Sequence, residues 1–247
     1  RLGVLGFFAA FVAIALLPVF GTDFGKGATR WYSLGFVSVQ PSEFLKPGFV
    51  VFAAWLMSAS SQIFGPPGKR LSLVVALILV AFLVTQPDFG QASLVLASWG
   101  IMYFVAGAPI LILVAIAGAT VFGGTLAYQH SEHFARRIDG FLSADVDPTT
   151  QLGYAANAIQ EGGFFGVGVG GGTVKWSLPD AHTDFIIAVA AEEYGLVLVL
   201  VVILLFMTVT VRSMYRLIRE RDPFTRLAGT GLAALFGLQA LINLGVA

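Results

Sequence analysis

The sequence predicts an all-α integral membrane protein, built as a polytopic bundle of transmembrane helices. Apolar residues make up 57% of its 247 residues and charged residues only 11%, whereas soluble domains carry about 25% charged residues. The mean hydropathy is +0.86. A composition with 29 glycines and 22 phenylalanines suits helices that pack closely in lipid. These observations exclude an ordinary soluble domain.

Charge and cysteine content exclude further classes of function. The chain has 14 basic and 14 acidic residues, so its formal net charge is zero. A nucleic-acid partner requires an excess of basic residues, so none is expected. The absence of cysteine excludes a disulfide framework and thiolate catalysis.

Seven apolar stretches are expected to form membrane-spanning helices, because most approach the ~20 residues that cross ~30 Å of hydrocarbon. The third and fourth stretches are short, and they are either two spans or one broken span. The seven stretches are Leu2–Phe20, Phe44–Gln62, Leu71–Thr85, Ala92–Val105, Ile110–Tyr128, Phe185–Val211 and Leu227–Val246.

Two basic loops decide between these alternatives. Lys69 and Arg70 lie in one loop, and five arginines lie between Arg212 and Arg226. If the third and fourth stretches are separate spans, both loops fall on one side, which the positive-inside rule makes cytoplasmic. We therefore predict seven spans in one membrane domain over residues 1–247. Its cytoplasmic loops are at about 63–70 and 212–226, and its extracytoplasmic loops at about 21–42 and 129–184.

The outer loop at 129–184 is longer than connecting loops usually are, so we expect it to fold partly onto the bundle. The chain begins at Arg1 without an initiator Met and stops at Ala247, at the end of an apolar stretch. It is therefore expected to be a fragment of a longer protein.

Ionisable residues near hydrocarbon depth cost at least ~2.5–3.5 kcal/mol each, so they persist where they are paired or used. The first such segment contains Lys26, Arg30, Ser42, Glu43 and Lys46. Ser42 is expected to cap the second helix, and Glu43 to stabilise its first turn and to pair with Lys46. The functional alternative is a cationic rim of Lys26, Arg30 and Lys46 that binds a phosphorylated headgroup.

The second segment is Gln86-Pro87-Asp88-Phe89-Gly90. Proline and glycine favour a tight turn between two spans. Asp88 is alternatively the N-cap of the following helix.

The third segment is a glycine-rich run from Glu161 to Gly172, in which Gly166, Gly168 and Gly171 satisfy G-x-G-x-x-G. A dinucleotide-binding fold is excluded, because no strand precedes the run and the loop is predicted outside the cytoplasm. The run is either a mobile loop beside a substrate cleft or a flexible linker.

The fourth segment leads from Leu178 directly into the apolar helix that begins at Phe185. Thr183 or Asp184 is expected at the helix start, with Glu192 and Glu193 two turns inside the span. Glu192 would then lie about 12 Å along the helix from Asp184. Two adjacent carboxylates inside a span need partners or protons.

His130, Glu132 and His133 have loose metal-ligand spacing. The sequence offers no clear third ligand of the kind that a structural zinc site needs, so no metal site is assigned.

Together these segments resemble the SEDS family (shape, elongation, division and sporulation), the polytopic polymerases of bacterial peptidoglycan. Within the family, Gly170–Lys175 and Leu178–His182 are most similar to the cell-division member, particularly its alphaproteobacterial form, and the elongation member is the near alternative. The resemblance rests on Lys26–Trp31, Gln40–Glu43 with Lys46, Gln86–Gly90, Ala181–Ile186 and Ala191–Gly195, which follow in the family's order.

The resemblance implies a fold of about ten spans, of which this chain would hold the third to the ninth. It also implies polymerisation of lipid II, a disaccharide-pentapeptide on undecaprenyl pyrophosphate, with loss of the lipid pyrophosphate. Asp184 matches the family's essential acidic residue. It would accept the proton of the attacking hydroxyl or help to hold a divalent cation, Mg²⁺ or Mn²⁺.

Positive charge near the pyrophosphate would come from Arg30 and Lys26, with Lys46, Arg136 and Arg137 as secondary candidates. We expect Asp184 and Arg30 to face one cavity at the outer membrane surface. The residues expected to bind substrate are Lys26, Arg30, Glu43, Lys46, Asp88, His182, Glu192 and Glu193. The implied partners are a class B penicillin-binding transpeptidase and other division-complex proteins of the inner membrane at the septum.

Two other classes of function stay open. Glu192, Glu193 and the short third and fourth stretches would also fit a transporter or a lipid II flippase. The sequence lacks the paired interrupted segments in symmetric halves that many carriers show. The remaining alternative is a non-catalytic membrane scaffold.

Overall fold

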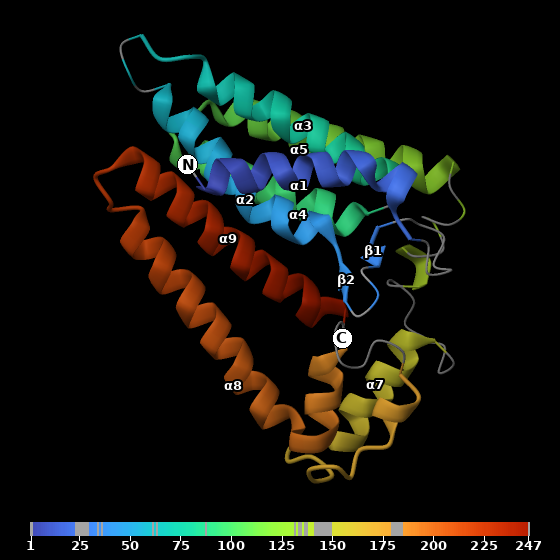
Figure 1. Ribbon diagram of the computed structural model, residues 1–247. Helices are drawn as coiled ribbons and strands as arrows, with labels where there is room; N and C mark the ends of the chain where they lie inside the picture. The colour runs from blue at the N-terminus through green and yellow to red at the C-terminus, as the bar shows by residue number, and fades with distance from the viewer. Residues whose placement is uncertain are drawn as a thin grey trace. The chain divides into compact units, whose positions relative to one another are not determined.

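The structure is a computed structural model that consists mainly of α-helices (Figure 1). Two compact units share the chain. The first contains Arg1–Pro109 and Val209–Gln239, and the second contains Ile110–Thr208 and Ala240–Ala247. The residues that the structure describes are 2–22, 30–33, 35, 37–60, 62, 64–86, 88–130, 132, 135, 138–140, 150–178 and 185–246.

A helix is present at each of the seven predicted positions. Among the described residues, five of these helices are long and apolar enough to cross a membrane, namely α1, α3, α5, α8 and α9. Helix α4 is shorter, with 17 residues, and the first two turns of α2 carry Glu43 and Lys46. The helices are α1 (Leu2–Phe20), α2 (Pro41–Ala59), α3 (Gly68–Thr85), α4 (Phe89–Val105), α5 (Ile110–His130), α8 (Ile186–Leu217) and α9 (Pro223–Val246).

Helices α3 and α4 are two antiparallel helices rather than one broken span. The Lys69 ammonium, at the start of α3, donates to the Ala106 carbonyl beyond the end of α4 at 2.8 Å. One turn further, the buried Trp99 indole donates to the Ser72 hydroxyl at 3.1 Å. Both contacts join the beginning of one helix to the end of the other, as the two-span prediction requires.

Helices α1 and α2 pack closely in the first unit. The rings of Phe7 and Phe52 stack with centroids 4.7 Å apart. A Cβ atom at Gly48 would lie 2.9 Å from the Phe7 Cα atom, so only glycine allows this approach. Small residues at such contacts are typical of helices that associate in lipid.

The predicted loop at 21–42 contains two short strands, which the all-α prediction did not include. Strand β1 (Tyr32–Ser33) pairs antiparallel with β2 (Ser38–Val39), with Tyr32 opposite Val39. The Tyr32 hydroxyl donates to the Ala13 carbonyl of α1 at 2.7 Å. This hydrogen bond fastens the loop to the bundle.

Loop 212–226 is shorter than predicted, because α8 continues to Leu217 and α9 begins at Pro223. In the second unit, the long segment before α8 contains helix α7 (Gln151–Gly162) and a single 3₁₀ turn, η1 (Val174–Trp176). The described part of this segment therefore contains helical structure, while its expected packing onto the bundle stays a prediction.

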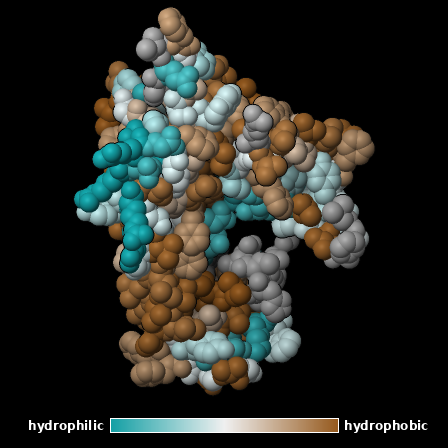
Figure 2. Space-filling model, turned by 60° about the vertical axis from the view of Figure 1, so that its left-hand side comes forward, coloured by the Kyte–Doolittle hydropathy of each residue, from teal (hydrophilic) through white to brown (hydrophobic). Residues whose placement is uncertain are grey.

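Large apolar side chains cover much of the molecular surface, and Figure 2 shows them in brown on one face. On α8, Leu204, Leu205 and Met207 are each more than half exposed. Soluble monomers rarely expose apolar surfaces of this extent. The exposed apolar helices fit a multi-pass membrane protein, in which lipid covers such surfaces.

Candidate functional site

The N-cap residue of α2 is not the one that the sequence predicted. Gln40 occupies the N-cap position and Pro41 the first helical position, so Ser42 lies inside the first turn. Proline favours that position because its fixed φ suits the helix and its missing N–H is not needed there. The prediction that Ser42 is the N-cap was wrong. The Ser42 hydroxyl is buried and has no hydrogen-bond partner among the described residues.

Glu43 and Lys46 form the predicted ion pair, with 2.8 Å between Lys46 Nζ and Glu43 Oε2. The Lys46 side chain is 2% exposed and that of Glu43 is 43% exposed. Lys46 also donates to Gln239 Oε1 of α9 at 2.6 Å, and Gln91 of α4 donates to Glu43 at 2.8 Å. Lys46 is therefore a buried, paired cation that joins α2 to α9 rather than part of an exposed cationic rim.

Asp88 is buried in the turn between α3 and α4, with 8% of its surface exposed. It occupies the N-cap position of α4 but its side chain makes no capping hydrogen bond. Instead it accepts a hydrogen bond from the Gln40 amide at 3.3 Å. Burial raises the pKa of Asp88, and the nearby charges of Arg30 and Lys46 oppose that rise.

Arg30 belongs to the same polar region. Its Nε donates to the Gln86 carbonyl, in the turn before Asp88, at 3.0 Å. The first unit thus brings together Arg30, Asp88, Glu43 and Lys46. Lys26 lies outside the described residues.

Sequence reasoning missed two residues of this region, Gln91 and Gln239. Gln91 directly follows the Gln86–Gly90 motif, and Gln239 is a polar residue in an apolar helix. Polar residues within membrane helices are costly and usually have a role. Both glutamines could therefore have been selected from the sequence.

In the second unit, α8 is broken at Gly195, which has φ 82° and ψ 174°. The glycine-rich segment supplies the hydrogen bonds that the break removes. Val167 and Gly168 donate their backbone N–H groups to the carbonyls of Glu192 and Glu193, at 2.9 and 3.1 Å. In return, the N–H of Leu196 donates to the Gly163 carbonyl at 2.9 Å.

The glycine-rich segment is therefore bound to α8 along its length, and the flexible-linker interpretation was wrong. Glycine is required at Gly166, where φ is +80° and a Cβ atom would lie 2.2 Å from the Glu193 carbonyl oxygen. No side chain fits that contact.

The Glu192 carboxylate holds the end of the glycine-rich segment. Glu192 is 1% exposed, and its Oε1 accepts hydrogen bonds from the backbone N–H groups of Thr173 and Val174 at 2.6 and 3.0 Å. Its Oε2 has no hydrogen-bond partner within the described part of the chain. Lys175, which sequence reasoning did not select, pairs with Glu193 at 2.5 Å. Glu193 thus has a cationic partner, whereas Glu192 is satisfied through one of its two oxygens.

The break also changes where these carboxylates lie. They were predicted inside the span, but they precede Gly195. From Leu196 to Val211, the last residue before Arg212, the helix is about 24 Å long at about 1.5 Å per residue, which is most of the ~30 Å thickness of the hydrocarbon. Glu192 and Glu193 therefore belong to a short helical segment before the long apolar one.

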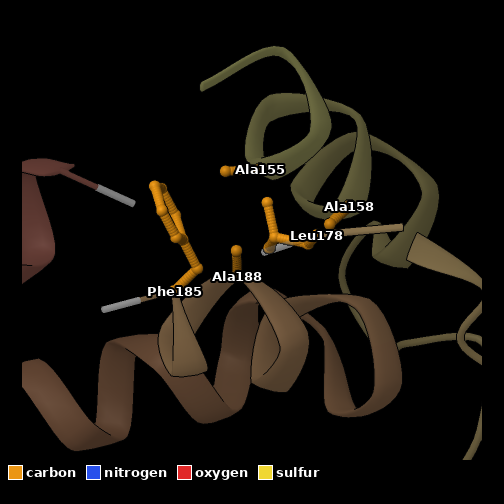
Figure 3. Close-up of a cluster of buried hydrophobic side chains, with 5 residues drawn as sticks. All are labelled: Ala155, Ala158, Leu178, Phe185 and Ala188. Carbon is orange, nitrogen blue, oxygen red and sulfur yellow. The ribbon is translucent and has the colours of Figure 1, made fainter. Parts of the chain in front are cut away.

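A small apolar cluster contains the residues on either side of segment 179–184, the segment to which Asp184 belongs. Leu178 and Phe185 are buried together with Ala155 and Ala158 of α7 and Ala188 of α8 (Figure 3). Residues 179–184, including His182, Thr183 and Asp184, lie outside the described residues, so their predicted roles stay predictions.

The described residues include no group of three or more His, Cys, Asp or Glu side chains that could hold a metal ion. His130 Nδ1 lies 3.0 Å from the Leu126 carbonyl of its own helix. His133, Arg136 and Arg137 fall outside the described ranges.

The comparisons with known proteins give the family. The family model for the cell cycle proteins FtsW, RodA and SpoVE matches residues 1–247. The chain belongs to this family. It is the SEDS family that the motifs resemble, and the polytopic helical fold agrees with this membership.

Two SEDS relatives are both named probable peptidoglycan glycosyltransferase FtsW. The one from Caulobacter vibrioides is 40% identical over 240 residues, covering 97% of this chain and 61% of the relative. The one from Trichlorobacter lovleyi is 34% identical over 241 residues, covering 95% of this chain and 63% of the relative. The chain thus spans somewhat less than two thirds of these relatives.

Two solved structures share the SEDS fold. One is described as "Structural coordination of polymerization and crosslinking by a peptidoglycan synthase complex". It has a TM-score of 0.75 and 26% identity, covering 99% of this chain and 70% of that one. The other is the D255A mutant of the rod shape determining protein RodA from Thermus thermophilus. It has a TM-score of 0.65 and 25% identity, covering 100% of this chain and 66% of that one.

Proposed function

We propose that the protein is a peptidoglycan glycosyltransferase of the division type, which polymerises lipid II at the septum in the bacterial inner membrane. The observation that carries this proposal is the 40% identity, over 97% of the chain, to the Caulobacter vibrioides protein with that activity in its name. The Trichlorobacter lovleyi relative has the same name. Both names favour the division role over the elongation role.

In this reaction a sugar hydroxyl attacks the anomeric carbon of a lipid-linked sugar. A new glycosidic bond forms while the bond from that carbon to the pyrophosphate oxygen breaks, and the pyrophosphate leaves with the bonding electrons. We assign the proton of the hydroxyl to the Asp184 carboxylate, a contribution of typically 10²–10⁴-fold in rate. Support comes from the next residue, Phe185, which is anchored in the buried cluster beside α7.

The departing pyrophosphate needs positive charge. We assign this role to Arg30, whose guanidinium is directed by its hydrogen bond to the Gln86 carbonyl, and to Lys26. A divalent cation held with the help of Asp184 is the alternative source of charge. Lys46 is better suited to hold Glu43 in place, because it is buried and paired.

The remaining predicted residues divide into two roles. Asp88 and Glu43 offer polar groups to a substrate headgroup, and His182 is assigned to the same role. The Ser42 hydroxyl and the Gln91 side-chain oxygen are buried near these groups and have no hydrogen-bond partner among the described residues. Glu192 and Glu193 instead position the glycine-rich segment, because their carboxylates bind Thr173, Val174 and Lys175.

We further propose a class B penicillin-binding transpeptidase as partner, together with other membrane proteins of the division complex. One of the two similar structures is described as a peptidoglycan synthase complex that coordinates polymerisation with crosslinking. That description of a structural relative supports a crosslinking partner here.

The experiment that tests this function incubates the purified full-length protein and its transpeptidase partner with fluorescent lipid II in detergent. Long glycan strands, resolved by gel electrophoresis, are the expected product. A flippase would give no product, because a detergent micelle has no two leaflets between which lipid could move. If lipid II stays unchanged in this assay but is transported by the protein in proteoliposomes, the polymerase assignment is wrong and the protein is a flippase.

A further inference from the structure

The corner where α8 meets α9, residues 212–226, is strongly basic. It holds five arginines and two acidic residues. Arg212 and Arg216 lie four residues apart on one face of the end of α8, and Arg219 follows in the turn; all three are exposed. Figure 2, in which this side of the molecule comes forward, shows hydrophilic side chains in teal beside a hydrophobic surface in brown.

The two acidic residues of this basic corner accept hydrogen bonds from backbone N–H groups and from a threonine hydroxyl rather than from arginine side chains. Glu220 accepts a hydrogen bond from the backbone N–H of Arg221 at 2.8 Å. Asp222 accepts two from Thr225, from its N–H at 2.7 Å and its hydroxyl at 2.6 Å, and so caps α9. Within the described residues neither acid forms an ion pair with an arginine, and the five arginines and two acids leave the corner a net charge of +3.

Two arginines of the corner are placed where they could donate hydrogen bonds to a bound ligand. The Arg219 guanidinium lies over the Tyr215 ring, 4.1 Å from its centroid, which orients it. The Arg226 Nε is buried and has no hydrogen-bond acceptor among the described residues. A buried N–H without an acceptor is costly, so a small movement of the Arg226 side chain that brings this N–H to a phosphate oxygen would be favourable.

We propose that the basic corner binds the phosphate of an anionic phospholipid headgroup at the membrane surface. Guanidinium groups match phosphate oxygens with paired hydrogen bonds, and clusters of four to eight basic residues beside a membrane helix attract anionic lipids. A lipid fits better than free phosphate, because Tyr215, Ile218 and Phe224 expose apolar side chains at the same corner. These side chains would contact the lipid below its headgroup.

Lipid binding to the purified protein in detergent tests the proposal by native mass spectrometry. Phosphatidylglycerol is compared with phosphatidylcholine for the wild type and for the variant Arg212→Gln/Arg216→Gln/Arg219→Gln. We expect wild type to prefer phosphatidylglycerol. The triple glutamine variant should lose about a hundredfold in affinity, since each basic residue near an anionic surface contributes about fivefold. Arg70→Gln, which removes a charge elsewhere, is the matched control and should change binding less than twofold.

Replacing the same three arginines by lysine should keep most of the preference, which also shows that the region still folds. Equal binding of the two lipids by wild type, or full binding of phosphatidylglycerol by the triple glutamine variant, would overturn the proposal. Complete displacement of the lipid by millimolar inorganic phosphate would show a site for free phosphate and would also overturn it. Displacement by a polyglutamate peptide at equal concentration would assign the surface to an acidic protein partner instead.

Discussion

The Glu192 carboxylate lies 2.6 Å from the backbone nitrogen of Thr173, although nineteen residues separate the two in sequence. This contact joins the glycine-rich segment to the helix that follows it. Hydrogen bonds to a charged acceptor contribute about 1.5–3 kcal/mol each. The contact therefore fixes the chain just before the segment that carries Asp184.

Replacing Glu192 tests this role. Glu192→Ala removes the acceptor of two hydrogen bonds, from the part-buried N–H groups of Thr173 and Val174, at about 0.5–1.5 kcal/mol each. Glu192→Gln keeps an acceptor oxygen and should cost less. Thermal unfolding and limited proteolysis between Gly163 and Trp176 measure both effects. Wild-type stability and protease resistance in the alanine variant would contradict the role.

The close contact at Gly166 gives a second prediction. Gly166→Ala forces a Cβ atom against the Glu193 carbonyl at a positive φ, so the variant should lose at least about 1–3 kcal/mol of unfolding free energy. Gly123→Ala in α5 is the matched control, because nothing lies within 4 Å of the added atom. Equal unfolding temperatures of the two variants would show that the segment is not packed as described.

A double-mutant cycle tests the link between α2 and α9. Lys46→Met and Gln239→Leu together should show a coupling free energy of about 0.5–3 kcal/mol in denaturant unfolding, because their side chains share a part-buried hydrogen bond. Gln62→Leu provides the control, since it lies beyond the far end of α2. Its effect should add to that of Lys46→Met within about 0.5 kcal/mol. Additivity in both pairs would remove the proposed link.

The raised pKa of Asp88 predicts how the stability of the protein depends on pH. Its pKa is raised above 3.8 by burial, so the folded state binds its proton more tightly than the unfolded state does. Stability from this group is fully present below the unfolded pKa and is lost as the pH rises through the folded pKa. The unfolding temperature of wild type relative to Asp88→Asn should therefore fall as the pH rises from about 4. A constant difference would contradict the raised pKa.

Sequence patterns predicted the positions of the membrane helices well, because burial in lipid demands long apolar runs that are visible directly. The two-span interpretation of Leu71–Thr85 and Ala92–Val105 followed from charge placement alone. The start of α2 was misplaced because Pro41 overrides the capping preference of Ser42.

The second unit was less predictable. Residues around Glu192 and Gly195 have the pattern of a continuous helix, and the break depends on hydrogen bonds from a segment some thirty residues earlier in the chain. Gln239 was missed for the same reason, since its partner Lys46 lies 193 residues away in sequence. Local patterns cannot show which distant group will satisfy a buried polar atom.

The central claim is that Asp184 accepts the proton in glycan polymerisation. The most direct test is the initial rate at which the full-length protein, with its transpeptidase partner, consumes lipid II. Asp184→Asn should reduce that rate by about 10²–10⁴-fold. The control Asp222→Asn, which keeps a capping side chain at α9, should stay within twofold of wild type. A wild-type rate for Asp184→Asn would contradict the assignment.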